Sequence, residues 1–373
     1  MNISKGEKVL ISGASFAGLS TAFWMNQMGY DVTIVEISPG LKLGGTPVNI
    51  RGNTIGIVQR MGLFEAIKAN RLHIDLWEFK NADNITEGSM QLRQAGEPMP
   101  DDDYEIERNV LLNMLFDTVK ADVTLMFSNS ITSIHETNDG VLVTFRNGEQ
   151  QSFSLVFGCD GIHSAVRRMC FGNEAAYAHF LGQYFSITIV NKLLIRENTA
   201  QLYNVPDKAI MLNAYNNKTD IIFGFRSDEE IPYDYRDHAQ QKRIIREQFE
   251  GESWRTTELL AEIMNSEPFY FDKLCQIKMP SWTKGRIALV GDAGYCASPA
   301  AGMGGSLAID GAAALADAMQ RHQGNFEKAF QDYNKDLRPF IEAVQEEAVQ
   351  SGLASLVPRT EEAIRERNLK GFQ

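Results

Sequence analysis

The pattern of hydrophobic and polar positions is clearest near the start of the chain. An apolar run at residues 8–12 is followed by a glycine-containing turn at residues 13–18, and residues 17–28 then carry apolar side chains at helical spacing. A second apolar run, at residues 31–35, ends at Glu36. The order strand, tight turn, helix, strand and carboxylate is typical of a dinucleotide-binding βαβ unit.

The turn between this strand and helix suits a diphosphate group. Gly13 and Gly18 allow backbone N–H groups at the positive end of the helix to approach phosphate oxygens, and Glu36 can accept hydrogen bonds from ribose hydroxyls. Ser15 replaces the middle glycine of the fingerprint. The turn also resembles a nucleophile elbow, but only fourteen residues precede Ser15, too few for the strands and oxyanion hole of such a hydrolase. We therefore favour dinucleotide binding.

Two later apolar runs end in an aspartate and a glycine. The run at residues 155–159 precedes Asp160-Gly161, and the run at residues 286–290 precedes Gly291-Asp292. Because parallel strands deliver their carboxyl ends to one edge of a sheet, we expect these pairs to lie beside the first turn, where Asp292 can accept a hydrogen bond from a ribityl hydroxyl. The glycine-rich segment 302–305, at the start of a predicted helix, can offer backbone N–H groups to a flavin carbonyl oxygen.

Alternating apolar and polar positions between residues 177 and 272 predict an antiparallel sheet, with Ile221, Phe223 and Phe225 on one face of its last strand. Such an insert in a βαβ scaffold can cover a cofactor. Predicted strands of the insert cover residues 184–190, 200–205, 209–215 and 220–225, a hairpin is predicted at 72–99, and helices are predicted after residue 52 to 69 and at 109–120, 238–250, 256–264, 306–319 and 326–356.

The composition narrows the class of protein. The chain has 373 residues, enough for two joined domains or one large one. A net charge of −12 argues against a nucleic-acid partner. The four cysteines and six histidines are scattered, so we expect reduced thiols and no metal site. We find no room for a signal peptide and no apolar run of about 18 residues, so we expect a cytoplasmic protein without membrane insertion, and a monomer.

Three separated motifs together resemble those of class A flavoprotein monooxygenases of the para-hydroxybenzoate hydroxylase type, and the resemblance spans nearly the whole chain. The first turn resembles the family's FAD diphosphate motif, Asp160-Gly161 its Asp-Gly motif, and Gly291-Asp292 its Gly-Asp motif. Arg108 resembles the family arginine that opens a helix beside the flavin. The spacing within residues 44–51 and 277–286 is most similar to the tetracycline-inactivating branch.

Four positions depart from the family pattern. Ser15 replaces a glycine, Met303 and Ser306 stand where the flavin loop often has Gln and Asn, and Gly311 stands where the following helix usually has Asp. We expect these changes to affect the position of the flavin or the shape of the pocket, whereas the backbone amides of the loop are retained.

The resemblance implies an α/β fold. It consists of a Rossmann-like FAD-binding domain of the GR2 type, a β-rich substrate-binding insert and a C-terminal helix. The expected division is a discontinuous FAD-binding domain at residues 1–71, 105–175 and 273–325, a substrate-binding domain at 72–104 and 176–272, and a bridging C-terminal helix at 326–373.

The resemblance also implies the cofactors. FAD would be bound non-covalently, NADPH or NADH would be a transient co-substrate, and O2 would add to the flavin C4a atom to give a hydroperoxide. No catalytic side chain is expected, because the flavin carries the chemistry. The expected cofactor contacts are Gly13, Ser15, Phe16, Ala17, Gly18, Glu36, Arg51, Arg108, Asp160, Gly161, Gly291, Asp292, Pro299, Gly302, Met303 and Gly304.

The implied substrate is a bulky, electron-rich aromatic or enol compound, polycyclic and tetracycline-like or another polyketide. Two alternatives stay open: a flavoprotein reductase or dehydrogenase without oxygen insertion, and a non-catalytic protein that binds FAD or a polycycle. A flavin halogenase is disfavoured because the sequence has no W-x-W pair. The substrate contacts expected in the insert, each of which can equally be core or surface, are Tyr184, Met211, Phe223, Phe225 and Arg226.

Overall fold

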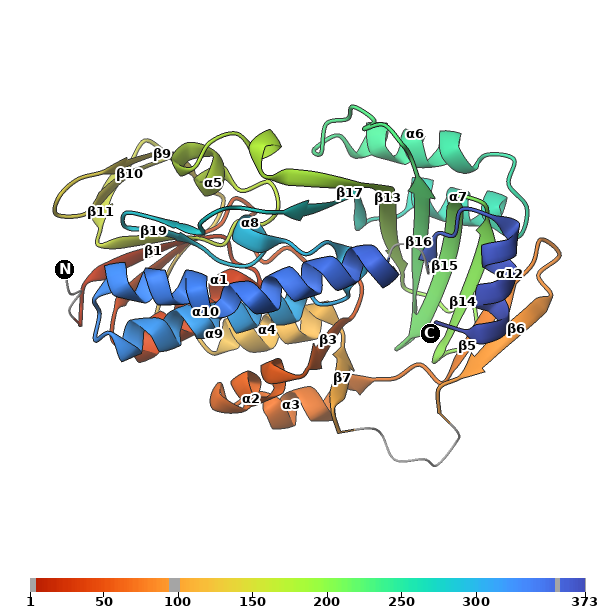
Figure 1. Ribbon diagram of the computed structural model, residues 1–373, viewed down its shortest axis with the longest axis horizontal. Coiled ribbons are helices and arrows are strands. Elements are labelled where there is room, and N and C mark those ends of the chain that lie inside the picture. Colours follow the sequence, from red (N-terminus) through yellow and green to blue (C-terminus); the bar gives the residue numbers. More distant parts are fainter. Residues whose placement is uncertain (1–4, 94–100, 353–355, 373) are drawn as a thin grey trace.

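The computed structural model describes residues 5–93, 101–352 and 356–372. Figure 1 shows two regions side by side, with a parallel sheet and its helices on the left and a large antiparallel sheet on the right. This arrangement confirms the expected α/β fold with a β-rich insert.

The six-stranded sheet is built mainly from parallel pairs. Strand β1 (Lys8–Ser12) lies between β2 (Asp31–Val35) and β12 (Leu155–Gly158), and all three run in the same direction. Their carboxyl ends therefore meet at one edge, as the sequence predicted. The remaining strands are β8 (Thr124–Met126) beside β2, β19 (Ile287–Leu289) beside β12, and the antiparallel β18 (Thr283–Lys284) at the outer edge.

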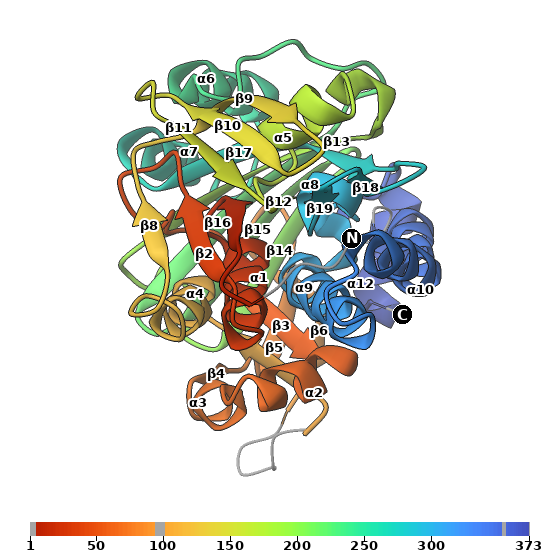
Figure 2. The same ribbon diagram turned by 90° about the vertical axis from the view of Figure 1, so that its left-hand side faces the viewer.

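Helices cover one face of this sheet, and a small sheet lies over the other side. Figure 2 shows α1 (Phe16–Gln27), α9 (Gly304–Arg321) and α10 (Phe326–Glu347) in a row, and α9 packs against both of its neighbours. The elements on the other side are β9 (Ile131–Glu136), β10 (Val141–Phe145), β11 (Gln150–Phe153) and α5 (Ala165–Cys170).

A second small sheet connects the two regions. Its order is β3 (Val48–Arg51), β7 (Asp103–Ile106) and β4 (Arg71–Leu72), and α4 (Arg108–Asp117) follows β7. The helical stretch predicted up to residue 69 is split into α2 (Asn53–Arg60) and α3 (Phe64–Ala69). The break falls at Gly62, whose φ of 74° cannot continue a right-handed helix.

The insert is a seven-stranded sheet with two covered faces. One face packs against α6 (His238–Phe249) and α7 (Thr256–Asn265), and the opposite face, here called the inner face, turns toward the flavin-motif region and the C-terminal segment. In sheet order the strands are β17 (Phe269–Ile277), β13 (Ala178–Val190), β16 (Lys218–Arg226), β15 (Lys208–Tyr215), β14 (Thr199–Val205), β5 (Leu76–Lys80) and β6 (Thr86–Gln91).

The pattern of burial in β16 follows the predicted alternation. Ile221, Phe223 and Phe225 are at most 1% exposed and share the face that meets the helices, which confirms that they lie on one side of the strand. The predicted hairpin at 72–99 corresponds to β5 and β6, and residues 94–99 lie outside the described ranges.

The C-terminal part differs from the single helix that the sequence predicted. α10 widens into a π turn at Ala348–Gly352, and residues 353–355 lie outside the described ranges. A further helix, α12 (Glu361–Lys370), then packs against β6 and β14 of the insert. We retain the expected division into domains as a proposal. None of the helices in the described ranges is long and apolar enough to cross a membrane.

Candidate functional site

The first turn requires glycine at two positions. Gly13 has a φ of 104°, and a Cβ there would lie 2.5 Å from the carbonyl oxygen of Cys159. A Cβ on Gly18 would lie 1.9 Å from the carbonyl oxygen of Gly13. Both clashes involve backbone atoms, so neither can be relieved by a side-chain rotation. The first turn is thereby packed directly against the end of β12, next to Asp160.

The start of α1 offers unpaired N–H groups. Ser15 occupies the N-cap position, but its side chain does not cap the helix, and the first turn of α1 contains no acidic residue. The Ser15 hydroxyl instead accepts a hydrogen bond from Nη2 of Arg108 at 3.2 Å. A guanidinium cannot serve as the base that a nucleophilic serine needs, so this contact disfavours the hydrolase alternative. Within the described residues no side chain caps this helix start, so the N–H groups of Phe16 and Ala17 suit an anionic ligand.

Glu36 is fixed beside this turn. Its Oε2 accepts a hydrogen bond from the backbone N–H of Ala14 at 2.9 Å, and its Oε1 accepts one from the N–H of Ser38 at 2.8 Å. The carboxylate therefore lies at the carboxyl end of β2, facing the turn, where it retains lone pairs for hydroxyl donors.

Arg108 joins three segments around the same edge. Its Nη1 donates to the carbonyl oxygens of Lys42 and Gly44, at 2.9 and 3.0 Å, and its guanidinium lies 5.1 Å from the centre of the Phe16 ring. Burial lowers the pKa of Arg108, and the nearby Tyr270 and Asp292 act in the opposite direction.

Asp160 holds the second turn. Its carboxylate accepts hydrogen bonds from the N–H groups of Ala165 and Val166, at 2.8 and 3.1 Å, and from the hydroxyl of Ser164. Burial raises the pKa of Asp160, and these hydrogen bonds oppose the shift. The carboxylate thus fixes the start of α5, while Gly161, with a φ of 77°, allows the chain to turn.

The third turn brings Asp292 to the same edge. Gly291 has a φ of 68°, and a Cβ there would lie 3.0 Å from the Cβ of Ala17, so the third turn packs closely against the start of α1. Asp292 begins the short helix α8 (Asp292–Tyr295). Burial raises the pKa of Asp292, and Cys296 and the charge of Arg108 oppose this shift.

The predicted flavin loop precedes α9. Pro299 begins a 3-10 turn (Pro299–Ala301), Gly302 is left-handed with a φ of 63°, and Met303 is the N-cap residue of α9. The helix begins at Gly304 with no side-chain cap and no acidic residue in its first turn. Like α1, it therefore presents free N–H groups at its positive end.

Two of the departures from the family pattern have structural reasons. The hydroxyl of Ser306 donates to the carbonyl oxygen of Asn49 at 2.7 Å, which ties α9 to β3. At Gly311 a Cβ would lie 1.7 Å from the hydroxyl oxygen of Tyr295, so the space of a side chain is already filled by tyrosine.

The residues at this edge fit FAD. Two uncapped helix starts can bind diphosphate and carbonyl oxygens, Glu36 can accept from the ribose, and Asp292 can accept from the ribityl chain. Arg51, the last residue of β3, is half-buried, and its contact with the cofactor stays a prediction.

The structure separates the expected substrate residues. Tyr184, Phe223 and Phe225 are at most 1% exposed and belong to the core between the sheet and helices α6 and α7. These three rings therefore lie on the face of the sheet that packs against α6 and α7, and not on the inner face. Met211 lies on the inner face and is partly buried. Arg226 donates to the carbonyl oxygen of Val357 at 2.6 Å, which holds the C-terminal segment.

Several polar residues near the site were not found by sequence reasoning. Tyr270 and Asp272 in β17 and His163 after β12 form a hydrogen-bonded group, although His163 and Asp272 are 109 residues apart. The only signal in the sequence was the position of His163 within the Asp-Gly motif. Glu107, next to Arg108, accepts from Nδ2 of Asn216 at 2.6 Å and from Nζ of Lys218 at 2.5 Å, which anchors the β15–β16 turn.

Two further carboxyl groups are the buried Asp220 in β16 of the insert and the half-buried Glu105 in β7. Burial raises the pKa of Asp220 to about 7, with contributions from Glu105 and Glu107, while a hydrogen bond from Tyr215 opposes the shift. Burial also raises the pKa of Glu105 to about 7, with a contribution from Asp103. Both carboxyl groups therefore titrate near neutral pH.

We expect Asp220→Asn to change the pH dependence of stability. The folded-state pKa of about 7 lies above the unfolded value near 3.8, so the contribution of Asp220 to stability is greatest below pH 4 and is lost as the pH rises through 7. Asparagine cannot ionise. The free energy of unfolding of the variant should therefore rise relative to that of the wild type between pH 4 and 7, by on the order of 2 kcal/mol. Urea unfolding at several pH values measures the difference. Asp122→Asn, at an exposed position, serves as the control. If the stability of Asp220→Asn changed with pH in the same way as that of the wild type, the prediction would be contradicted.

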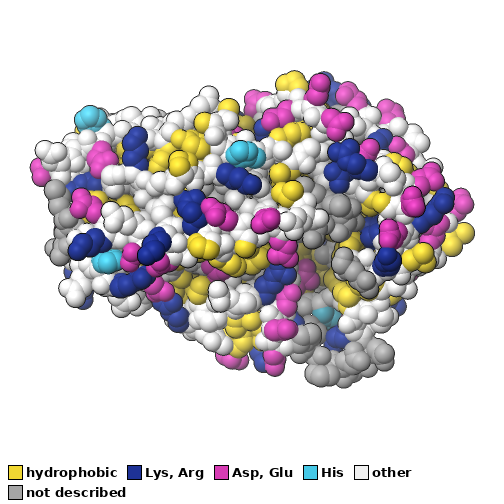
Figure 3. All heavy atoms as spheres, viewed as in Figure 1, with side chains coloured by type: hydrophobic (Ala, Val, Ile, Leu, Met, Phe, Trp, Pro, Cys, Tyr) yellow, Lys and Arg dark blue, Asp and Glu magenta, His cyan; other side chains and the backbone are white. Residues whose placement is uncertain are grey.

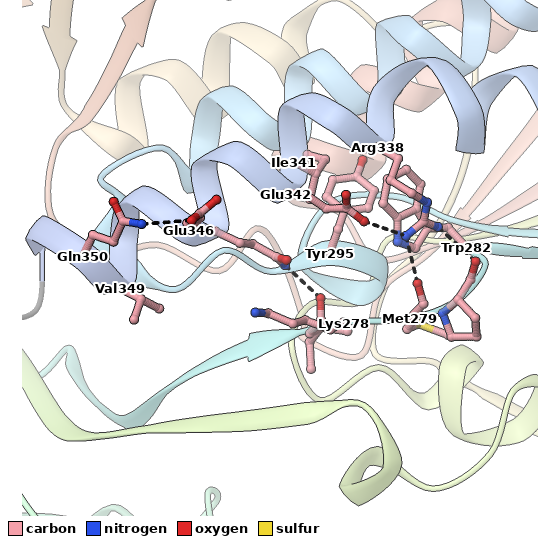
Figure 4. A pocket seen from close by; sticks show the side chains of 13 residues that line it. Lys278, Met279, Trp282, Tyr295, Arg338, Ile341, Glu342, Glu346, Val349 and Gln350 are labelled. Atoms are coloured by element: carbon pink, nitrogen blue, oxygen red, sulfur yellow. Dashed lines mark hydrogen bonds and ion pairs between the residues drawn. The ribbon is translucent and has the colours of Figure 1, made fainter.

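A separate groove of about 780 Å³ runs along α10. Figure 4 shows Arg338 and Trp282 at one end and Glu346 and Gln350 toward the other. Arg338 donates to the carbonyl oxygen of Met279 at 3.0 Å and lies 4.5 Å from the centre of the Trp282 ring. None of the expected cofactor residues lines this groove, so it is distinct from the edge where the three turns meet.

A parallel sheet whose strand ends present this set of donors and acceptors defines a doubly wound, flavin-binding protein. The chain belongs to the FAD binding domain family, whose model matches residues 7–348. This match confirms the expected FAD-binding family. Relatives that are named flavin-dependent monooxygenases confirm the expected enzyme class, an oxidoreductase.

Named relatives agree with this assignment. A flavin-dependent monooxygenase of Legionella longbeachae is 36% identical over 347 residues, covering 92% of this chain and 88% of the relative. A flavin-dependent monooxygenase from an unknown prokaryotic organism is 34% identical, covering 91% of this chain and 88% of the relative.

Solved structures show the same architecture. The tetracycline destructase Tet(51) superposes with a TM-score of 0.87 at 34% identity, covering 97% of this chain and 95% of that structure. Tet(55) gives a TM-score of 0.85 at 33% identity, covering 97% and 94%. CtdE in complex with FAD and a substrate, at 18% identity and a TM-score of 0.76, shares the fold.

Proposed function

We propose that this monooxygenase uses NADPH or NADH and O2 to hydroxylate a bulky, electron-rich aromatic or enol substrate, with tetracycline-like polyketides as the first compounds to test. The names of Tet(51) and Tet(55) support this substrate class. Bound FAD would supply the oxygen-transfer chemistry of a flavin hydroperoxide. We also propose that the protein acts as a cytoplasmic monomer, and light scattering after gel filtration tests the oligomeric state.

The observation that carries the proposal is the composition of the inner face. Ile187 and Ile222 are cross-strand neighbours, and Ile222 is in turn paired with Met211, so a row of apolar side chains crosses three strands. Phe185 packs beside Tyr270, with ring centres 5.4 Å apart. Aromatic rings and an adaptable methionine suit a flat, polycyclic ligand.

The charge distribution is compatible with a neutral or weakly charged substrate. Figure 3 shows Lys and Arg side chains interspersed with Asp and Glu across this view of the molecule, without a field of one sign. In this proposal the side chains at the motif edge hold and orient the cofactor: Arg108 fixes the loop at Gly44, and Asp160 fixes the turn at the start of α5.

Isotope labelling tests the proposed reaction. The FAD-loaded protein, NADPH and tetracycline are incubated under ¹⁸O₂, together with a panel of phenols and polyketides, and the products are analysed by mass spectrometry. One labelled oxygen in a product supports the proposal. NADPH oxidation that yields only hydrogen peroxide across the panel would contradict it. Anaerobic turnover to a reduced product would favour the reductase alternative. Binding of FAD or a polycycle without NADPH oxidation would favour the non-catalytic binding protein.

The cofactor assignment predicts a loss of affinity for Asp292→Ala. Removing the carboxylate leaves a ribityl hydroxyl without its acceptor, and a hydrogen bond to a charged group contributes about 1.5–3 kcal/mol. FAD should therefore bind roughly tenfold more weakly or worse. Titration of the apoprotein with FAD, followed by flavin fluorescence, measures the dissociation constant. The exposed Asp122→Asn provides a control, and equal affinities for Asp292→Ala and the wild type would assign Asp292 a purely structural role.

A further inference from the structure

Tyr270 lies at the start of β17, where the insert meets the flavin-motif region. Its cross-strand neighbour on the inner face is Ile187, and its side chain is only partly buried. The preceding Pro268 abuts the loop that Arg108 holds, because a Cβ on Gly44 would lie 3.2 Å from the Pro268 ring. The strand therefore begins directly beside the arginine of the flavin site.

Tyr270 also interacts electrostatically with two of the expected cofactor residues. Burial raises the pKa of Tyr270 well above its ordinary value, and Asp272, Cys296 and Asp292 raise it further. Arg108 in turn is influenced by Tyr270 and Asp292. Together with the contact between Pro268 and Gly44, these mutual influences relate Tyr270 to Arg108 and Asp292, which the motifs assign to the flavin.

Asp272 fixes the direction of this hydroxyl. Tyr270 donates to Oδ2 of Asp272 at 3.2 Å, and the same oxygen lies 3.2 Å from Nε2 of His163. The other oxygen accepts from the N–H of Lys273 at 2.8 Å and from the hydroxyl of Tyr233. Asp272 is 4% exposed, so the carboxylate is a fixed acceptor, and the Tyr270 oxygen keeps its lone pairs free for a donor in the site.

His163 connects this carboxylate to the third turn. Its Nδ1 lies 3.2 Å from Oε1 of Glu174, whose Oε2 accepts from Arg167 at 2.9 Å, and Arg167 donates to the carbonyl oxygen of Ala293 at 2.8 Å. Burial alone would lower the pKa of His163, but Asp272 and Glu174 raise it to about 9. The imidazole is thus protonated at neutral pH and donates to both carboxylates. The network links Tyr270 to the residue that follows Asp292.

We propose that Tyr270 is a further contact residue of the flavin site, and that Asp272 and His163 are its positioning residues. The Tyr270 oxygen accepts a hydrogen bond from a ring N–H or a ribityl hydroxyl of the bound FAD. Because this contact concerns the cofactor, it is independent of which substrate the enzyme hydroxylates.

Tyr270→Phe tests the contact without activity measurements. Loss of one neutral hydrogen bond should weaken FAD binding roughly two- to tenfold. Bound FAD should also become more fluorescent, because a phenol in contact with the isoalloxazine quenches its emission by electron transfer and a phenyl ring does so much less. Tyr184→Phe is the matched control, since it removes a hydroxyl from the neighbouring strand on the opposite face, where Tyr184 accepts from the N–H of Ile231. Unchanged affinity and fluorescence in Tyr270→Phe would overturn the proposal.

Variants of His163 test the positioning role. His163→Ala should increase the fluorescence of bound FAD, as Tyr270→Phe does. His163→Gln keeps one hydrogen-bond donor, so its FAD fluorescence should be closer to that of the wild type. In the double variant Tyr270→Phe, His163→Ala, the effects on FAD affinity should not add, because both changes remove the same contact. Additive effects would overturn the positioning role. If His163→Ala does not fold, His163→Gln tests the same role: its FAD fluorescence should lie between those of the wild type and Tyr270→Phe, and a value equal to the wild type would overturn the positioning role. A wild-type protein that binds no FAD would instead refute the cofactor assignment itself.

Discussion

Replacing Gly311 by alanine is expected to lower the free energy of unfolding by about 3 kcal/mol, because overpacking a filled core forces neighbouring groups apart. The new Cβ would lie 1.7 Å from the hydroxyl oxygen of Tyr295 and 2.8 Å from its Cζ. Tyr295 is 1% exposed and accepts a hydrogen bond from Tyr333 at 3.1 Å, so the ring cannot withdraw without breaking this contact. Chemical denaturation followed by circular dichroism measures the loss.

Gly56→Ala is the matched control for this substitution. Gly56 also lies in a helix, α2, but it is exposed and a Cβ there meets no atom within 4 Å. Alanine should raise the stability at this position by ~0.5–1 kcal/mol, because it has a higher helix propensity. The two Gly→Ala changes should therefore have opposite signs. A Gly311→Ala protein as stable as the wild type would show that Tyr295 has an alternative position.

Replacing Arg167 by methionine is expected to cost ~3 kcal/mol or more. Arg167 is fully buried, donates to the carbonyl oxygens of Ala293 and Ile162, and pairs with Glu174. Methionine fills much of the same volume but leaves two carbonyl oxygens and a carboxylate without their donor, and breaking one side of a buried pair is strongly destabilising. Thermal unfolding of the two proteins measures the difference.

The neighbouring arginine provides a strict control for this variant. Arg168 is exposed, and Arg168→Met removes the same charge one residue further along α5. Its effect should stay within about 0.5 kcal/mol, as for most surface substitutions. Equal effects of the two substitutions would mean that the loss of charge, rather than the buried contacts of Arg167, determines the stability.

The edge of the parallel sheet was predictable because its parts are local. Each of the three turns follows an apolar strand within a few residues, so strand, glycine and acid can be recognised together, and the direction of parallel strands then brings the turns to one edge. The same local reasoning shows that Ser15 replaces a glycine of the fingerprint, but it does not show that Ser15 contacts Arg108. The hydrogen bond from Arg108 joins residues 93 positions apart, and no local pattern encodes it.

The inner face of the insert could not be identified from alternation. The pattern in β16 shows that Phe223 and Phe225 share a side, but both sides of this sheet are covered, one by α6 and α7 and the other by the flavin-motif region. When both faces of a sheet carry apolar residues, the alternation in the sequence does not tell which face packs as core and which lines a cavity. The alternation therefore leaves Tyr184 equally open as a pocket or core residue, and its ring packs among those of the helix-covered side.

Helix α12 was missed because its buried residues are polar. Arg367 and Asn368 are 8% and 7% exposed, and the Arg367 guanidinium lies 4.7 Å from the centre of the Phe79 ring. A helix that packs through a cation–π contact has no apolar stripe to recognise, since the pattern assigns an arginine to the surface.

The contact of Glu107 with the β15–β16 turn connects movement of the insert to the cofactor. Asn216 and Lys218 both bind this carboxylate, and the next residue in the chain is Arg108. A displacement of the β15–β16 turn would therefore act on the residue that precedes Arg108, whose guanidinium holds Gly44 and Ser15. The turn of the insert and the edge assigned to the flavin are thus joined through one peptide bond, between Glu107 and Arg108.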